Sequence, residues 1–249
     1  MSFAPCFIVP VYNHGATVGA TVRALAGHGL PIYLVDDGSA ADTARVLDGL
    51  AAEDAQVRLV RRPHNGGKGA AVMSGIRAAH GEGCSHALQV DADGQHNLAD
   101  IPDFLAAAAA DPAALICGVP EYDASVPKGR LYGRYATHVW VWIETLSFAI
   151  RDSMCGFRVY PLAPVHRLIE GVHLGPRMEF DIEVLVRLYW RGVRIVNRPT
   201  RVIYPEGGLS HFRVLRDNLR ISWMHTRLVA GMLVRLPLLL ASKIGGRQP

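Results

Sequence analysis

The strongest constraint on the fold is an alternation, along the first half of the chain, between short β-branched runs and segments of helical periodicity. Runs at 7–12 and 32–36 have the length of buried strands, and the segment at 16–26 between them has helical spacing. Parallel strands need such crossover segments, so this order predicts a largely parallel sheet covered by helices. The alternation continues through helices expected at 42–52, 70–80 and 101–110 and strands expected at 57–61, 87–90 and 115–119.

The second half of the chain is less regular and reads as a mixed α/β extension. No linker separates it from the first half, so we expect one α/β domain over residues 1–212, followed by a helical tail over 213–249. The expected elements of this half are helices at 132–150 and 179–190 and strands at 157–160 and 194–204.

Composition places the chain among globular proteins of a reducing compartment. Half of the residues are hydrophobic and 19% are charged, which is a globular balance. The N-terminal segment has no basic region followed by a long apolar run, so no secretory signal is expected. The cysteines form no CxxC pair, which argues against a disulfide framework or a structural zinc site and fits the cytoplasm. They are Cys6, Cys84, Cys117 and Cys155.

The sharpest local signal is a pair of carboxylates, Asp91 and Asp93, that directly follows an apolar strand. In open α/β sheets ligands bind beyond the carboxyl ends of the strands. Two carboxylates one residue apart can share a hard divalent cation, which in turn neutralises a diphosphate. The alternative for such a turn is a solvated acidic loop.

Two other strand ends carry polar side chains. The first expected strand ends in Tyr12 and Asn13, and the second ends in Asp36 and Asp37. Either aspartate can accept hydrogen bonds from a base or ribose, and Tyr12 can stack on the base. A helix N-cap and an asparagine turn would explain the two ends separately. Their coincidence at one edge of the sheet favours a binding site.

A glycine-rich turn at 64–69 opens the third expected helix and contains Lys68. Free backbone N–H groups and the ammonium group can face an anion there. The segment is neither a Walker loop nor a dinucleotide fingerprint, because no Ser or Thr follows the lysine and no GxGxxG follows the first strand. A simple tight turn is the alternative.

Ordered motifs along the chain resemble the inverting family 2 glycosyltransferases of GT-A fold, and among them the dolichyl- and polyprenyl-phosphate sugar transferases. The motifs are PVYN at 10–13, VDDGS at 35–39, NGGKG at 65–69, DADGQH at 91–96, DSMCGFR at 152–158 and MEFDIE at 178–183. The resemblance covers roughly residues 5–212. It implies a Rossmann-like, mostly parallel sheet flanked by helices, with a C-terminal amphipathic helical tail.

The resemblance also implies a UDP- or GDP-sugar donor bound by residues 1–100 and an acceptor bound by residues 101–212. A divalent cation, Mg²⁺ or Mn²⁺, would stabilise the leaving diphosphate. The residues implied around it are Asp91, Asp93, Gln95 and, from a later loop, His211, with Asp93 also catalytic. His14 stands where the family commonly has an acidic residue, so the donor cannot be copied from mannose-transferring relatives. The implied donor-binding residues are Pro10, Tyr12, Asn13, Asp36, Asp37, Lys68, Asp91, Ala92 and Asp93.

Two classes of acceptor stay open. A hydroxyl acceptor, on a glycolipid or glycan, needs a general base, for which Glu179 or Asp181 is the candidate. A phosphate acceptor needs no base but attracts cations, which Lys128, Arg130 and Arg134 offer. These three residues are otherwise a solvated helix start. The resemblance favours a polyprenyl phosphate or another membrane lipid as the acceptor.

The tail beginning at Arg213 carries a basic stripe with leucines and valines largely on its other side. Such a helix suits an anionic lipid surface, so we expect a peripheral protein on the inner face of the cytoplasmic membrane. Packing on its own domain, with a solvated arginine face, is the alternative. The apolar run is interrupted at Pro237 and is short for a bilayer span. The stripe, within an arc of roughly 100° on a regular helix, consists of Arg213, Arg216, Arg220, Arg227 and Arg235.

Two further classes of function fit the residues less well. A non-catalytic family member that binds nucleotide has no chemical need for both Asp91 and Asp93. The net charge of +4 favours acidic partners, but the arginines lie on an apolar-backed tail rather than among exposed aromatics in a groove. We therefore expect an enzyme without a nucleic-acid partner.

Overall fold

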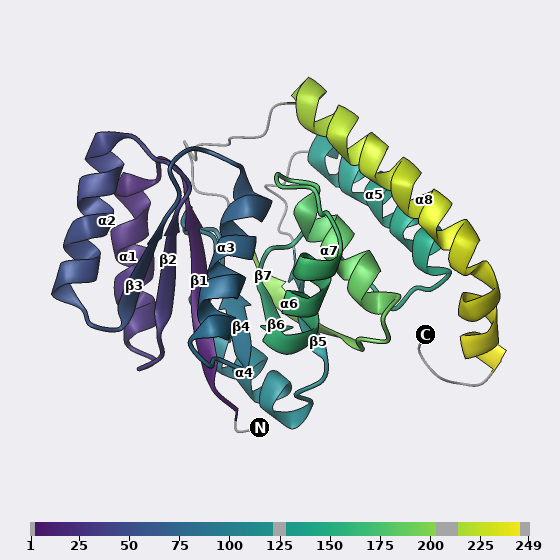
Figure 1. The fold of residues 1–249 in the computed structure, drawn as a ribbon, viewed down its shortest axis with the longest axis horizontal. Coiled ribbons are helices and arrows are strands. Elements are labelled where there is room, and N and C mark those ends of the chain that lie inside the picture. The colour runs from purple at the N-terminus through teal and green to yellow at the C-terminus, as the bar shows by residue number, and fades with distance from the viewer. Residues whose placement is uncertain (1–2, 122–127, 203–213, 245–249) are drawn as a thin grey trace.

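A seven-stranded sheet forms the centre of the protein, and helices cover both of its faces (Figure 1). The computed structural model describes residues 3–121, 128–202 and 214–244, without the side chains of 128–131 and 242–244. The strands are Pro5–Val11 (β1), Ile32–Asp36 (β2), Val57–Arg61 (β3), His86–Gln89 (β4), Leu115–Glu121 (β5), Arg158–Pro161 (β6) and Ile195–Arg201 (β7). Their order across the sheet is β3-β2-β1-β4-β6-β5-β7.

Most neighbouring strands run parallel, which confirms the predicted fold class. β1 pairs in parallel with both β2 and β4, β2 pairs in parallel with β3, and β5 pairs in parallel with β7. β6 runs antiparallel between β4 and β5 and joins the two parallel blocks. As a result, the carboxyl ends of β2, β1 and β4 lie next to one another at one edge of the sheet.

Alternation along the strands divides the interior into two apolar cores, since successive side chains of a strand point to opposite faces. Cys6 and Ile8 of β1 join the core on the side of α3, α6 and α7, whereas Phe7, Val9 and Val11 join the core on the side of α1, α2 and α4. The helices are Gly15–Ala26 (α1), Ala41–Glu53 (α2), Lys68–Gly81 (α3), Ile101–Ala110 (α4), Lys128–Thr145 (α5), Leu162–Gly171 (α6), Phe180–Tyr189 (α7) and Val214–Ile244 (α8), with a 3₁₀ turn at Leu98–Asp100 (η1).

Sequence periodicity missed α6 and extended two elements too far. Pro164 lies in the first turn of α6, where proline is tolerated, and no side-chain cap marks the start of the helix. The helix predicted to reach residue 150 ends at Thr145, because Leu146 adopts a φ of 50°. The last strand, predicted over 194–204, ends at Arg201, and Val202 forms only an isolated bridge. Residues 203 and 204 lie outside the described residues.

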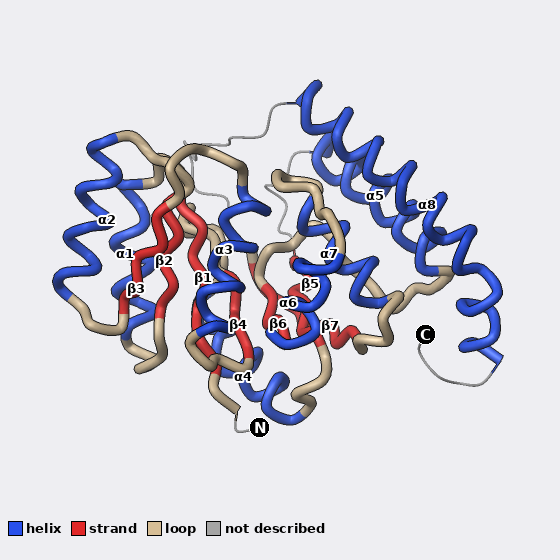
Figure 2. The backbone as a smooth tube through the Cα atoms, viewed as in Figure 1, coloured by secondary structure: helices blue, strands red, loops and turns tan. Residues whose placement is uncertain are grey.

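The C-terminal helix α8 lies beside α5 on one side of the domain (Figures 1 and 2). One face of α8 contributes Ile221, Met224 and Leu228 to the core that it shares with α7. The helix is 31 residues long and contains Pro237. The predicted amphipathic tail is therefore present, as a helix docked on its own domain.

Two arginines of the α8 stripe differ from the expected solvent- or lipid-facing arrangement, whereas Arg216 and Arg220 are exposed as expected. Arg227 pairs with Glu183 of α7 at 3.2 Å, and the Arg235 guanidinium lies 4.9 Å from the centroid of the Trp190 ring. Glu183 is fully buried, and a buried carboxylate requires cationic partners. Arg213 lies outside the described residues.

Two helix glycines allow the effect of helix propensity on stability to be measured separately from the effect of core packing. A Cβ on Gly75 of α3 would lie 2.7 Å from Ile8 Cγ2 and 3.1 Å from Val35 Cγ2, whereas a Cβ on Gly49 of α2 would meet nothing within 4 Å. Gly75→Ala should therefore lower the free energy of unfolding by about 1–3 kcal/mol through overpacking. Gly49→Ala should raise it by about 0.5–1 kcal/mol through helix propensity. Urea denaturation measures both, and equal effects would contradict this packing.

Candidate functional site

The candidate site lies where three parallel strands end. β1 is flanked by β2 and β4, with Val11 beside Asp36 and Ile8 beside Gln89. The chain leaves β4 through Val90 and Asp91, which brings the predicted carboxylate motif next to the ends of β1 and β2. Helix α3 crosses the same edge and places its first residue, Lys68, there.

Lys68 bridges two of the predicted site carboxylates. Its Nζ lies 2.8 Å from Asp91 Oδ2 and 3.0 Å from Asp181 Oδ2. Burial disfavours the ammonium ion, but Asp181 and Asp91 outweigh this effect and hold the pKa of Lys68 above its usual range. Lys68 is therefore a fixed positive charge between the strand end and the start of α7.

Asp91 has two further partners. His96 Nε2 lies 3.4 Å from Asp91 Oδ2, and Gln89 Nε2 donates a hydrogen bond of 3.3 Å to Oδ1. Burial disfavours the carboxylate, but Lys68 and His96 hold the pKa of Asp91 well below its ordinary value. Asp91 is thus ionised and held in place on several sides.

The glycine-rich turn before α3 is held by the carboxylate of Asp37. Oδ1 accepts hydrogen bonds from Gly66 N at 3.0 Å and from Arg62 Nε at 2.8 Å, and Oδ2 accepts one from Gly67 N at 2.7 Å. Gly67 has a φ of 103°, which suits glycine. Asp37 is 2% exposed, so its contacts in this structure are those of a turn anchor.

The neighbouring polar residues tie the ends of β1 and β2 together. Asp36 accepts hydrogen bonds from Ser39 N at 2.8 Å and from Arg61 Nε at 3.1 Å. Asn13, at a φ of 56°, accepts one from Ala40 N at 2.8 Å through its side chain. Pro10 lies within β1, and Tyr12 is half-buried directly beyond it.

Beneath Lys68 lies a buried polar layer that the sequence analysis did not assign. Arg158 is fully buried and donates hydrogen bonds to Asp181 O at 2.5 Å and to Ser153 O at 2.8 Å. Tyr160 donates one to Gln89 Oε1 at 3.3 Å. Arg158 belongs to the motif DSMCGFR and His96 to DADGQH, so these two motifs could have pointed to both residues as part of the site.

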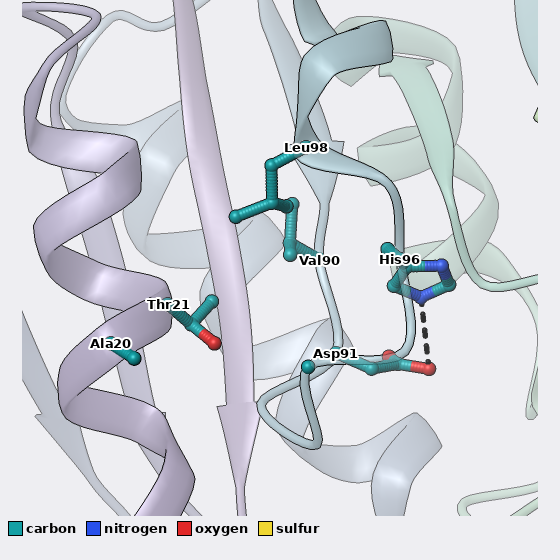
Figure 3. A pocket seen from close by; sticks show the side chains of 7 residues that line it. Ala20, Thr21, Val90, Asp91, His96 and Leu98 are labelled. Carbon is teal, nitrogen blue, oxygen red and sulfur yellow. Dashed lines mark ion pairs between the residues drawn. The ribbon is translucent and has the colours of Figure 1, made fainter. Parts of the chain in front are cut away.

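A small cavity opens beside Asp91. Its volume is about 210 Å³, and Ala20 and Thr21 of α1 line it opposite Asp91, Gly94 and His96. Figure 3 shows the imidazole of His96 directed at the Asp91 carboxylate, with Thr21 on the helix across from them. Ala92 is buried, and its carbonyl accepts a hydrogen bond from Thr17 Oγ1 at 2.7 Å.

The predicted metal ligands Asp91, Asp93 and Gln95 lie together in the turn that follows β4. Asp93 is half-buried, and its Oδ1 accepts a hydrogen bond from Gln95 N at 3.1 Å. Among the described residues, no group of three His, Cys, Asp or Glu side chains is placed to hold a metal ion. The two carboxylates Asp91 and Asp93 have the hard oxygen donors that Mg²⁺ or Mn²⁺ prefers. Predicted ligand His211 lies outside the described residues.

The predicted acceptor residues fall into two groups. Glu179 and Asp181 are 4% and 5% exposed, and Glu179 Oε1 accepts a hydrogen bond from Arg177 N at 3.4 Å. Arg134 of α5 donates to Asp152 at 2.5 and 2.6 Å, and His138 Nε2 lies 3.3 Å from the same carboxylate. The side chains of Lys128 and Arg130 lie outside the described ones, so their predicted role stays a prediction.

Comparison with known proteins identifies the family. The model described as glycosyl transferase family 2 matches residues 6–167. The chain belongs to this family. Among curated relatives, it is 30% identical over 166 residues to a dolichyl-phosphate beta-glucosyltransferase of Dictyostelium discoideum, an alignment covering 62% of this chain and 49% of that protein. The chain thus spans about half the length of this relative.

Two further matches cover more of the chain. It is 26% identical over 212 residues to an undecaprenyl-phosphate mannosyltransferase of Micrococcus luteus, covering 82% of this chain and 85% of that protein. A mannosyltransferase from Pyrobaculum calidifontis, solved in complex with GDP-Man and Mn²⁺, superposes with a TM-score of 0.59 at 16% identity, covering 96% of this chain and 73% of that one. This family 2 protein therefore has the GT-A fold that its motifs imply.

The turn-anchoring contacts of Asp37 can be tested by a charge-neutral substitution. Asp37→Asn places an N–H₂ group against backbone or guanidinium donors and should lower the free energy of unfolding by about 2–3 kcal/mol. The matched control is Asp48→Asn, because Asp48 pairs with the neighbouring Arg61 at an exposed site and should cost below about 1 kcal/mol. Guanidinium denaturation compares them. Equal losses would mean that Asp37 does not anchor the turn.

Proposed function

We propose that this family 2 protein is an inverting hexosyltransferase that moves a sugar from a UDP- or GDP-sugar to a polyprenyl phosphate. The donor would lie along the ends of β2, β1 and β4, with its diphosphate near Asp91 and Asp93. The acceptor phosphate would approach from the side of α5 and α7. The polyprenyl-phosphate activities in the names of the relatives support this choice of acceptor.

The observation that carries the phosphate acceptor is the burial of both candidate bases. Asp181 is ion-paired with Lys68 at 3.0 Å, and Glu179 is only 4% exposed. A general base has to reach the proton that it takes, and neither buried carboxylate is open to an entering hydroxyl in this structure. A phosphate acceptor is already anionic and needs no base, so one of its oxygens can attack the anomeric carbon while the bond to the diphosphate breaks on the opposite face.

Asp91 and Asp93 would hold the divalent cation, and His211 is a candidate further ligand. When bound, the cation neutralises the charge that develops on the leaving diphosphate. Lys68 would stay nearby as a second positive charge, with Arg158 buried behind it. Lys128, Arg130 and Arg134 of α5 would supply cations for the acceptor phosphate.

Transfer to a hydroxyl of a glycolipid or glycan is the second candidate function. Glu179 Oε2 and Asp181 Oδ1 favour it, because within the described part of the chain neither buried oxygen has a hydrogen-bond partner. An acceptor that entered between α5 and α7 would meet these oxygens. In that case Glu179 or Asp181 would take the hydroxyl proton.

Exposed apolar side chains gather on one side of the molecule. Within the described residues, every exposed large hydrophobic side chain except Val46 belongs to α5, the loop after it, or α8, the two helices at one end of the domain in Figure 1. We call this the α5–α8 surface. It comprises Tyr132, Tyr135, Val139, Trp140, Ile143, Phe148, Val214, Leu215, Leu219, Trp223, Leu233, Val234, Leu238 and Leu240. Aromatic and aliphatic residues gathered in this way suit the boundary between lipid headgroups and acyl chains.

We propose that α8 lies in the plane of this boundary. By length and composition, Val214–Ala241 is apolar enough to cross a membrane, with a mean hydropathy of 1.3 in an 18-residue window. However, His225 pairs with buried Glu144 at 2.7 Å and Arg227 with buried Glu183. Crossing the bilayer would break both pairs, and the buried carboxyl group of Glu144 would lose its His225 partner, whereas Glu183 would keep Arg187 of α7 at 2.8 Å. Leaving such a buried group without its partner is costly.

The acceptor class can be tested with matched lipids. The purified protein should transfer sugar from UDP- or GDP-linked donors to a polyprenyl phosphate but not to the corresponding polyprenol. EDTA and Asp93→Ala should each lower the rate at least about 100-fold, because the diphosphate would then leave without charge stabilisation. Radiolabelled donor and thin-layer chromatography measure the product. Transfer to the polyprenol, lost in Asp181→Asn or Glu179→Gln, would establish the hydroxyl mechanism instead.

The membrane surface can be tested by vesicle flotation. Trp223→Glu with Val234→Glu removes two apolar side chains that are 64% and 81% exposed, so the fold should be kept. At about 1.5 kcal/mol or more for each buried side chain, binding to anionic vesicles should weaken roughly 100-fold. Val46→Glu, at an exposed apolar position on α2, is the control and should bind as the wild type does. Undiminished flotation of the double variant would exclude the α5–α8 surface.

A further inference from the structure

Lys68 holds a position that its motif alone does not explain. It is the first residue of α3, and its ammonium group reaches both a carboxylate beyond β4 and a carboxylate at the start of α7. Its side chain is 19% exposed, and that of Asp91 is 23% exposed. The Lys68 ammonium group therefore lies between the buried polar layer around Arg158 and the more exposed ends of β1, β2 and β4.

The backbone packs closely around the two ion pairs of Lys68, and two neighbouring positions are glycines that have no space for a Cβ. A Cβ on Gly156 would lie 2.7 Å from Lys68 Nζ and 3.0 Å from Asp91 Oδ2. A Cβ on Gly69 would lie 2.4 Å from Phe180 Cβ, so α3 and the start of α7 are in close contact. Because Gly156 and Gly69 have no side chain, Lys68 can approach both carboxylates closely. Lys68 and His96 both contact Asp91 Oδ2.

We infer that Lys68 is a positioning residue, which occupies Asp91 as a resident cation in the donor-free protein and yields Asp91 to the divalent cation of the donor. This inference rests on the proposed function. Asp181 would keep Lys68 in place after the exchange, because it lies in the first turn of α7, not at the strand end, and retains its ion pair with Lys68. Its Oδ1, which has no hydrogen-bond partner among the described residues, gives the ammonium a second acceptor.

The two carboxylates then have opposite effects on divalent-cation affinity. Asp91 is the ligand for which Lys68 and the divalent cation compete. Asp181 draws Lys68 away from Asp91 and so weakens the competition. A lysine that only stabilised the fold would lower affinity when removed, whereas a competing lysine raises it.

Titration with Mn²⁺ tests the competition directly. Free Mn²⁺ is followed by electron paramagnetic resonance, first without nucleotide and then with UDP or GDP. Lys68→Met should bind Mn²⁺ at least about tenfold more tightly than the wild type, since it removes a positive charge within contact distance of the ligand. Asp181→Asn should bind Mn²⁺ at least about tenfold more weakly, since Lys68 then pairs with Asp91 alone. Lys68→Arg keeps the charge and should stay near the wild type.

Two controls separate this competition from general effects. Arg177→Met removes a positive charge from the same region, where Arg177 contacts Asn65, and should change Mn²⁺ affinity less than about threefold. Circular dichroism and thermal unfolding verify that each variant is folded. If the wild type binds Mn²⁺ and Lys68→Met does not bind more tightly, the inference is wrong and the proposed function stands. If neither protein binds Mn²⁺ with or without nucleotide, both are wrong.

Discussion

The carboxylate of Asp37 fixes the chain at the edge of the sheet where β1, β2 and β4 end, which is the proposed donor site. Its two oxygens hold Gly66 N and Gly67 N and so fix the turn from which α3 starts. Gly38, at a φ of 71°, lies so close to this turn that a Cβ there would be 2.6 Å from the carbonyl carbon of His64. The VDDGS and NGGKG motifs, far apart in the sequence, are therefore one structural unit. This unit places Lys68 at the first residue of α3, where its ammonium group contacts Asp91.

The sequence was sufficient to predict the edge of the sheet but not the pairing of the charges on it. That β1, β2 and β4 have their carboxyl ends at one edge follows from the alternation of elements, because parallel strands joined by crossover helices run in one direction. The order of the strands does not follow from it. The contact between Lys68 and Asp181 joins residues 113 positions apart in the chain and depends on where α7 packs. Hydrophobic periodicity gives no information about this. The same holds for Arg158, a charged residue in a strand that periodicity treats as apolar.

The C-terminal helix illustrates a second limit of sequence periodicity. An arc of arginines can be read from the sequence, but the face that docks on the domain cannot. Glu144 and Glu183 are fully buried, and α8 provides His225 as a partner for Glu144 and Arg227 as a second partner for Glu183, beside Arg187 of α7. The domain side of α8 therefore carries these polar contacts beside the core residues Ile221, Met224 and Leu228, and further large apolar side chains are left on its exposed side.

One short segment, residues 152–158, connects the α5–α8 surface with the edge of the sheet where β1, β2 and β4 end. Arg134 of α5 is held by Asp152, whose Oδ1 also accepts hydrogen bonds from Met154 N at 2.9 Å and Cys155 N at 2.7 Å. The same segment continues to Arg158, which donates to Asp181 O. Polar contacts therefore run from α5 through this segment to Asp181, the residue that holds Lys68. If the acceptor approaches from α5, as proposed, the receiving surface and the charged centre are joined by this one segment, which contacts both Arg134 and Asp181.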